Sequence, residues 1–102
     1  MIPAIEKHRE ELENLCRRYS VRRLELFGSA ARGDFKEGRS DLDFLVEFRE
    51  GTPVEMADRY LGLLEELEVL FGTPVDLVMP KAIRNPYFQE GVNRSRELLY
   101  AA

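Results

Sequence analysis

The chain has 102 residues, of which 44% are hydrophobic and 33% are charged, with 15 Lys and Arg against 19 Asp and Glu. This length and balance predict one globular domain over residues 1–102 and exclude a disordered chain. The net charge of −4 at pH 7 argues against stable nucleic-acid binding, because contacts to phosphates need a surplus of basic side chains.

The chain contains one cysteine, Cys16, and one histidine, His8. These counts exclude an internal disulfide, a cysteine zinc site and a multi-histidine metal site. We expect Cys16 in the core and His8 at the surface. No apolar run approaches the roughly 18 residues of a membrane span, and the first twelve residues lack the apolar segment of a signal peptide. The expectation is a soluble cytoplasmic domain without membrane contact.

Hydrophobic periodicity predicts the elements of the first half of the chain. Apolar residues recur at helical spacing over residues 3–19, opposite a charged face, which predicts an amphipathic helix. Alternation over Val21–Phe27 and over Asp41–Phe48 predicts two strands. Between them, Ser29–Asp34 is expected to form one or two helical turns, and Phe35–Ser40 a polar loop.

The second half begins with a capping box, Thr52 to Glu55, which has proline at the first helical position. The helix is expected to end at Gly72 and to bury one stripe of side chains: Ala57, Tyr60, Leu61, Leu64, Leu67 and Phe71. A strand over Val75–Met79 and a helix over residues 86–96 follow. Glu97–Tyr100 is either the last turn of that helix or a short final strand. The fold class is therefore α/β (α+β), a small mixed β-sheet flanked by helices.

The junction Gly28-Ser29 between the first strand and the short helix is a candidate phosphate site. A helix N-terminus offers unpaired N–H groups, glycine allows close approach, and the serine hydroxyl adds a donor. The alternative is an ordinary turn in which Ser29 caps the helix, and the dipeptide taken alone favours that alternative.

Asp41 and Asp43 flank Leu42 in the second strand, so their carboxylates are expected on one face. Two adjacent anions repel each other, and a divalent cation would compensate them. Ligands that are all oxygen favour Mg²⁺ or Mn²⁺. The alternative is a strand with one solvent-exposed polar face.

Asp76 is the one charge in the apolar run Val75–Met79. A carboxylate flanked by apolar residues is costly in a strand unless it has a partner or faces a site. If the two strands are neighbours, Asp76 joins Asp41 and Asp43. A water-facing position on an edge strand is the alternative.

Together, the phosphate-binding junction and three carboxylates favour metal-assisted phosphoryl or nucleotidyl transfer.

These residues resemble the signature of the polymerase-beta-like nucleotidyltransferases: Gly-Ser, a spacer, Asp-x-Asp, and a third Asp on a later strand. In this chain the spacer has eleven residues, one more than the commonest form. The segments LFGSAARGD, SDLDFLVEF and PVDLV and the closing LLY are more closely similar to minimal nucleotidyltransferases (MNT). The resemblance extends over essentially the whole chain and implies the nucleotidyltransferase fold.

The resemblance implies a role for each motif. Asp41, Asp43 and Asp76 would be the catalytic residues and the ligands of two Mg²⁺ ions, and Gly28 and Ser29 would contact the phosphates of ATP. Arg39, beside the motif, is a candidate phosphate clamp, with a solvated loop arginine as the alternative.

The resemblance also implies a partner, because many such small proteins are antitoxins encoded beside a HEPN ribonuclease toxin. They are thought to transfer AMP from ATP to a toxin side chain. Two alternatives stay open: a non-catalytic antitoxin that occludes its partner, and a transferase acting on a small molecule or an RNA end. A homodimer and a hetero-oligomer with the partner are both compatible with the sequence.

Overall fold

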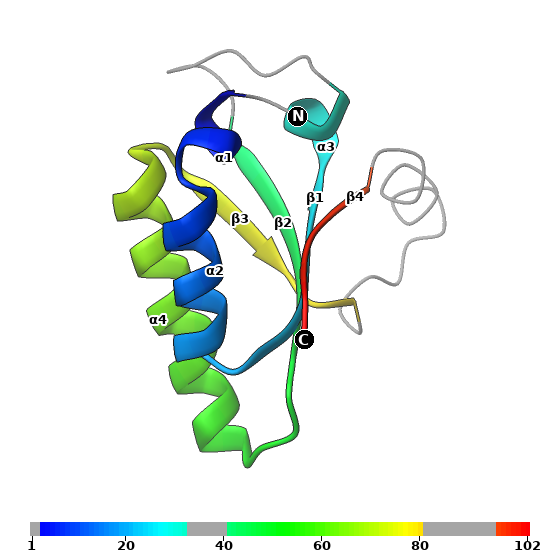
Figure 1. Cartoon of the computed structure of the whole chain (residues 1–102). Helices are drawn as coiled ribbons and strands as arrows, with labels where there is room; N and C mark the ends of the chain where they lie inside the picture. The colour runs from blue at the N-terminus through cyan, green and yellow to red at the C-terminus, as the bar shows by residue number, and fades with distance from the viewer. Residues whose placement is uncertain (1–2, 33–40, 81–95) are drawn as a thin grey trace.

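The computed structural model describes residues 3–32, 41–80 and 96–102, and Figure 1 shows how their helices and strands are arranged. The side chains of Ser29 and Arg32 lie outside this description. In chain order the elements are α1 (Pro3–Lys7), α2 (Arg9–Arg18), β1 (Val21–Phe27), α3 (Gly28–Arg32), β2 (Leu42–Phe48), α4 (Pro53–Phe71), β3 (Val75–Val78) and β4 (Glu97–Ala101).

The four strands form one mixed sheet in the order β3-β2-β1-β4. β1 pairs antiparallel with β2 and with β4, whereas β2 and β3 are parallel. Parallel neighbours need a crossover connection, and α4 supplies it between β2 and β3. The sheet predicted from the sequence is confirmed, as is the mixed α/β class.

The main core lies between one face of the sheet and the pair of helices α2 and α4, which lie side by side in Figure 1. Leu12 from α2, Phe44 from β2 and Leu67 from α4 are each 0% exposed. Cys16 lies in this core as expected, and burial raises the pKa of its thiol to about 12. The thiol therefore stays protonated and unreactive at neutral pH.

A second, smaller apolar cluster contains Phe27 from β1 and Leu45 from β2, with Val78 of β3 packed against them. Leu45 alternates with Phe44 and Val46 of the main core, so it projects to the opposite face of the sheet. Asp43, two residues before Leu45, belongs to this same face. The sheet therefore presents its predicted site on the side away from α2 and α4.

Local signals at the ends of α4 are confirmed. The backbone N–H of Glu55 donates to the Thr52 hydroxyl over 3.2 Å, and the backbone N–H of Thr52 donates to the Glu55 carboxylate over 2.9 Å. At the other end Gly72 adopts the left-handed conformation, with φ of +63°. These contacts satisfy backbone groups that a helix end leaves unpaired.

The single helix expected over residues 3–19 is wrong, because the structure divides it at His8 into α1 and α2. His8 has φ of −108° and ψ of 21°, and its ring meets the ring of Phe71 edge to face at 5.7 Å between centroids. The bend lets Ile5 and Leu12 both reach full burial. His8 is consequently half-buried rather than a surface residue, since α4 covers one side of its ring.

Two positions in the expected stripe of α4 are also wrong, because Ala57 and Leu61 are both exposed. Leu61 is 63% exposed, and Leu63 is fully buried beside Leu67. Glu97–Tyr100, for which two alternatives were open, belongs to a strand. The loop over Phe35–Ser40 and nearly all of the helix expected over residues 86–96 fall outside the described residues. None of the helices in the described ranges is long and apolar enough to cross a membrane.

Candidate active site

Strand β2 places Asp43 between two neighbours that matter for the site. In the pairing register Asp43 lies opposite Phe27 of β1 and opposite Asp76 of β3. Residues in register on adjacent strands project to the same face, and the strands lie about 4.8 Å apart. The structure therefore brings two of the three predicted carboxylates side by side.

Gly28 lies directly against one of these carboxylates. Its φ is +74°, and a Cβ built on its backbone would lie 2.2 Å from Oδ2 of Asp43. A side chain at this position would be strained and would displace the carboxylate. The β1–α3 junction thus needs glycine for two reasons, and the close approach joins the Gly-Ser motif to the Asp-x-Asp motif in space.

Asp41 immediately precedes β2 and is exposed. The strand begins at Leu42, one residue later than expected, and the Leu42 backbone N–H donates to the Pro74 carbonyl over 3.1 Å. This bond ties the start of β2 to the start of β3. Asp41, Asp43 and Asp76 therefore lie at one end of the sheet, where β1 ends and β2 and β3 begin.

The chemistry of the donor set suits Mg²⁺, since the three acids offer only carboxylate oxygens. Within the residues that the structure describes, no group of three or more His, Cys, Asp and Glu is arranged to hold a metal ion. Mg²⁺ sites in phosphoryl-transfer enzymes are typically completed by one or two carboxylates, substrate phosphates and water. The in-register pair of Asp43 and Asp76, which lies beside Gly28, fits such a partial site.

Two predicted site residues are not placed by the structure. The backbone of Ser29 belongs to α3, but its side chain lies outside the described residues, and so does the whole of Arg39. The expected phosphate contacts of both residues stay predictions.

Glu25 is a buried charge that the sequence pattern did not predict. It is 4% exposed, and it accepts hydrogen bonds from Arg96 at 2.6 and 2.7 Å and from Arg23 at 2.9 Å. The hydrogen bonds from Arg96 and, less strongly, from Arg23 lower the pKa of Glu25 although burial opposes this. Glu25 alternates with Leu24 and Leu26, so the pattern predicted only an outward polar face. Its partner Arg96 lies 71 residues further along the chain, so no residue near Glu25 in the sequence indicates this ion pair.

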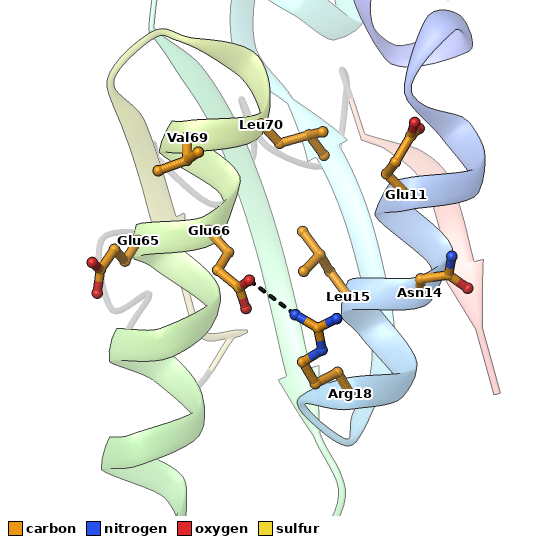
Figure 2. Close-up of a pocket in the computed structure, with 8 residues that line it drawn as sticks. All are labelled: Glu11, Asn14, Leu15, Arg18, Glu65, Glu66, Val69 and Leu70. Atoms are coloured by element: carbon orange, nitrogen blue, oxygen red, sulfur yellow. Dashed lines mark hydrogen bonds and ion pairs between the residues drawn. The ribbon is translucent and has the colours of Figure 1, made fainter.

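Two hollows in the described part of the chain lie away from the aspartates. One, of about 640 Å³, is lined by Phe48, Met56 and Met79 among others, near the end of β2 and the start of α4. The other, of about 410 Å³, lies between α2 and α4 (Figure 2). Neither is lined by Asp41, Asp43 or Asp76. The carboxylates, and not the hollows, therefore define the candidate active site.

Sequence comparison relates the chain to proteins of known class. The profile of the nucleotidyltransferase domain family matches residues 5–99. A provisionally assigned protein adenylyltransferase of Methanocaldococcus jannaschii is 38% identical over 96 residues, covering 94% of this chain and 89% of the relative. The protein adenylyltransferase MntA of Thermococcus cleftensis is 40% identical over 78 residues, covering 76% of this chain and 72% of the relative.

Solved structures agree with these matches. A provisionally assigned minimal nucleotidyltransferase, 38% identical, aligns with a TM-score of 0.66 over 91% of this chain and 90% of that chain. A chain from the structure of a tri-AMPylated Shewanella oneidensis HEPN toxin in complex with MNT antitoxin aligns with a TM-score of 0.63, over 95% of this chain and 72% of that chain. At 17% identity the second likeness shows the shared fold alone.

Proposed function

Because the chain belongs to the nucleotidyltransferase domain family and is a transferase, we propose that it moves AMP from ATP to a protein acceptor. The acceptor in this proposal is a HEPN-type toxin, which the chain neutralises as an antitoxin in the cytoplasm. The observation that carries the proposal is the pairing of Asp43 with Asp76, with the Gly28 backbone against the Asp43 carboxylate.

The proposal gives the carboxylates to Mg²⁺. Asp41, Asp43 and Asp76 would hold up to two ions, because adjacent carboxylates on one face repel each other unless a cation lies between them. Bound there, Mg²⁺ would neutralise charge on the phosphates and act as a Lewis acid. In the same proposal Asp76, the exposed acid on the edge strand, orients the attacking hydroxyl or accepts its proton.

The phosphates of ATP would lie at the β1–α3 junction. Gly28 leaves backbone space next to Asp43, where a side chain would block the approach of a ligand. Ser29 would donate its hydroxyl to a phosphate oxygen, and Arg39 would supply positive charge. The bond broken is that between the α- and β-phosphates, so AMP passes to the acceptor hydroxyl and pyrophosphate leaves.

The identity of the acceptor is proposed from the relatives. Two of the relatives are called protein adenylyltransferases, and a structural neighbour is the complex of an AMPylated HEPN toxin with an MNT antitoxin. A toxin held in a stable complex presents its own acceptor side chain, which suits a domain of this size.

The experiment combines the full chain with Mg²⁺, isotopically labelled ATP and the HEPN-domain protein encoded beside its gene. Intact-mass and peptide mass spectrometry then detect AMP on the partner. We expect Asp43→Asn to abolish the adduct. Glu47→Gln is the matched control, because Glu47 is an exposed acid further along β2 and its ion pair with Arg22 lies at the surface.

Each other outcome contradicts a stated part of the proposal. An adduct that persists in Asp43→Asn would remove the assigned metal ligand. A tight complex without an adduct would show neutralisation by occlusion. Neither a complex nor an adduct, with AMP transferred to a small molecule instead, would assign a different acceptor class.

A further inference from the structure

The outer surface of the helical layer contains a groove between α2 and α4, shown in Figure 2. Its hollow measures about 410 Å³. Leu15 of α2 and Leu70 of α4 form its apolar floor, and Val69 of α4 lies at its edge. Glu11 of α2 and Glu65 of α4 contribute its acidic rim. We call the hollow that these residues line, together with Asn14, Arg18 and Glu66, the α2–α4 groove.

Close packing at one end of the helix pair holds the groove in shape. Gly62 of α4 lies so near Tyr19 that a Cβ built on it would be 2.5 Å from a ring carbon. The Tyr19 hydroxyl donates to Glu66, and Arg18 forms an ion pair with Glu66 at 2.9 Å. These contacts connect the end of α2 to the middle of α4. The groove is therefore held by packed side chains of both helices.

Val69 leaves part of the apolar surface of the groove exposed to water. Its side chain is 79% exposed, the most exposed of the large hydrophobic residues in the described part of the chain. An extended apolar surface lying along the groove would cover Val69 together with Leu70.

The charged side chains around the α2–α4 groove leave an excess of negative charge. Among the described residues that line the groove, one is basic. This residue, Arg18, already forms an ion pair with Glu66. Glu65 is exposed, and the side chain of Glu11 is 58% exposed and lies 3.9 Å from the half-buried His8. The rim is therefore a negative border on an apolar floor, and a complementary surface would be apolar with basic flanks.

We propose that the α2–α4 groove binds an amphipathic helix of a partner protein, with apolar side chains at positions i, i+4 and i+7 and Lys or Arg beside them. From Glu11 to Arg18 the groove follows eight residues of α2, which are seven steps of 1.5 Å or about 10 Å of helix axis. Anchors at i, i+4 and i+7 span the same two turns of a bound helix. The lysines or arginines pair with Glu11 and Glu65.

The same charges disfavour the other occupants. A two-fold contact with a second copy would place the acidic rims of both chains against each other. Nucleic acid and anionic lipid would be repelled by Glu11 and Glu65. This surface is separate from the aspartates, so the inference is independent of the proposed transfer of AMP.

The test selects ligands from a phage-displayed library of random peptides of about 16 residues, long enough to form a helix. The full chain is the target, and Val69→Lys serves for counter-selection. We expect enriched sequences with apolar residues at helical spacing flanked by Lys and Arg. Calorimetry with the enriched peptides should show that Val69→Lys and Glu65→Lys each raise Kd by at least about tenfold.

Two variants on the same helix are matched controls. Val54 is 71% exposed and Asp58 is exposed, and neither lines the groove, so Val54→Lys and Asp58→Lys should leave Kd unchanged. The proposal is overturned if no groove-dependent peptides are enriched, if the enriched peptides are acidic or lack helical spacing, or if all four variants bind alike. A dimer of the wild-type chain in sedimentation that Val69→Lys dissociates would assign the groove to a second copy.

Discussion

Replacing Gly28 by alanine is expected to disable the candidate site while leaving the chain folded. A left-handed backbone costs alanine about 1–2 kcal/mol relative to glycine. The new Cβ would also lie 2.2 Å from Oδ2 of Asp43, and ordinary contact begins at 3.4 Å, so the carboxylate must retreat by about 1 Å. A misplacement of this size reduces catalysis by roughly 100-fold.

The assay pairs urea unfolding with the rate of AMP transfer. Gly72→Ala is the matched control, because Gly72 also has a positive φ, of +63°, and nothing lies within 4 Å of its Cβ position. Both variants should lose about 1–2 kcal/mol of stability, and only Gly28→Ala should lose transfer. Transfer at the wild-type rate in Gly28→Ala, or an equal loss in Gly72→Ala, would refute the close approach to Asp43 as the cause.

Thr52→Ala removes the capping box and should cost about 1 kcal/mol in the free energy of unfolding, measured in urea; an unchanged midpoint would contradict the cap. Glu25→Gln should cost about 1–3 kcal/mol at pH 7, because Arg96 loses its ionised partner. Since folding lowers the pKa of Glu25, this difference should be present at neutral pH and be lost as the pH falls through that lowered pKa; a pH-independent loss would argue against the ion pair. Gly62→Ala should destabilise the chain by about 1–3 kcal/mol through its clash with Tyr19, and an unaffected unfolding curve would show that the ring moves freely.

Elements with local chemical signals were predictable to within about one residue. The strand over Val21–Phe27, the capping box at Thr52 and the helix end at Gly72 all appear where the sequence placed them. Each depends on side chains that act on backbone groups a few residues away, or on alternation within one strand. Such signals need no knowledge of the rest of the chain.

Positions decided by packing were less accessible. The bend at His8 has neither proline nor glycine, and it follows from the way Ile5 and Leu12 fit the core. The buried stripe of α4 includes Leu63, which packs in the main core, and excludes Leu61, which is exposed. Both leucines are compatible with helical periodicity, so periodicity alone did not separate them.

The candidates for the site could be recognised from the amino-acid sequence: Gly28 at a strand end, Asp41 and Asp43 around Leu42, and Asp76 within an apolar run. The folded chain was needed to see that Asp43 lies in register with Asp76, that Gly28 lies against Asp43, and that the buried Glu25 pairs with Arg96. The physical reason is that strand register is set by hydrogen bonds and burial between segments far apart in the chain. The spacing of residues within one segment contains no information about these interactions between segments.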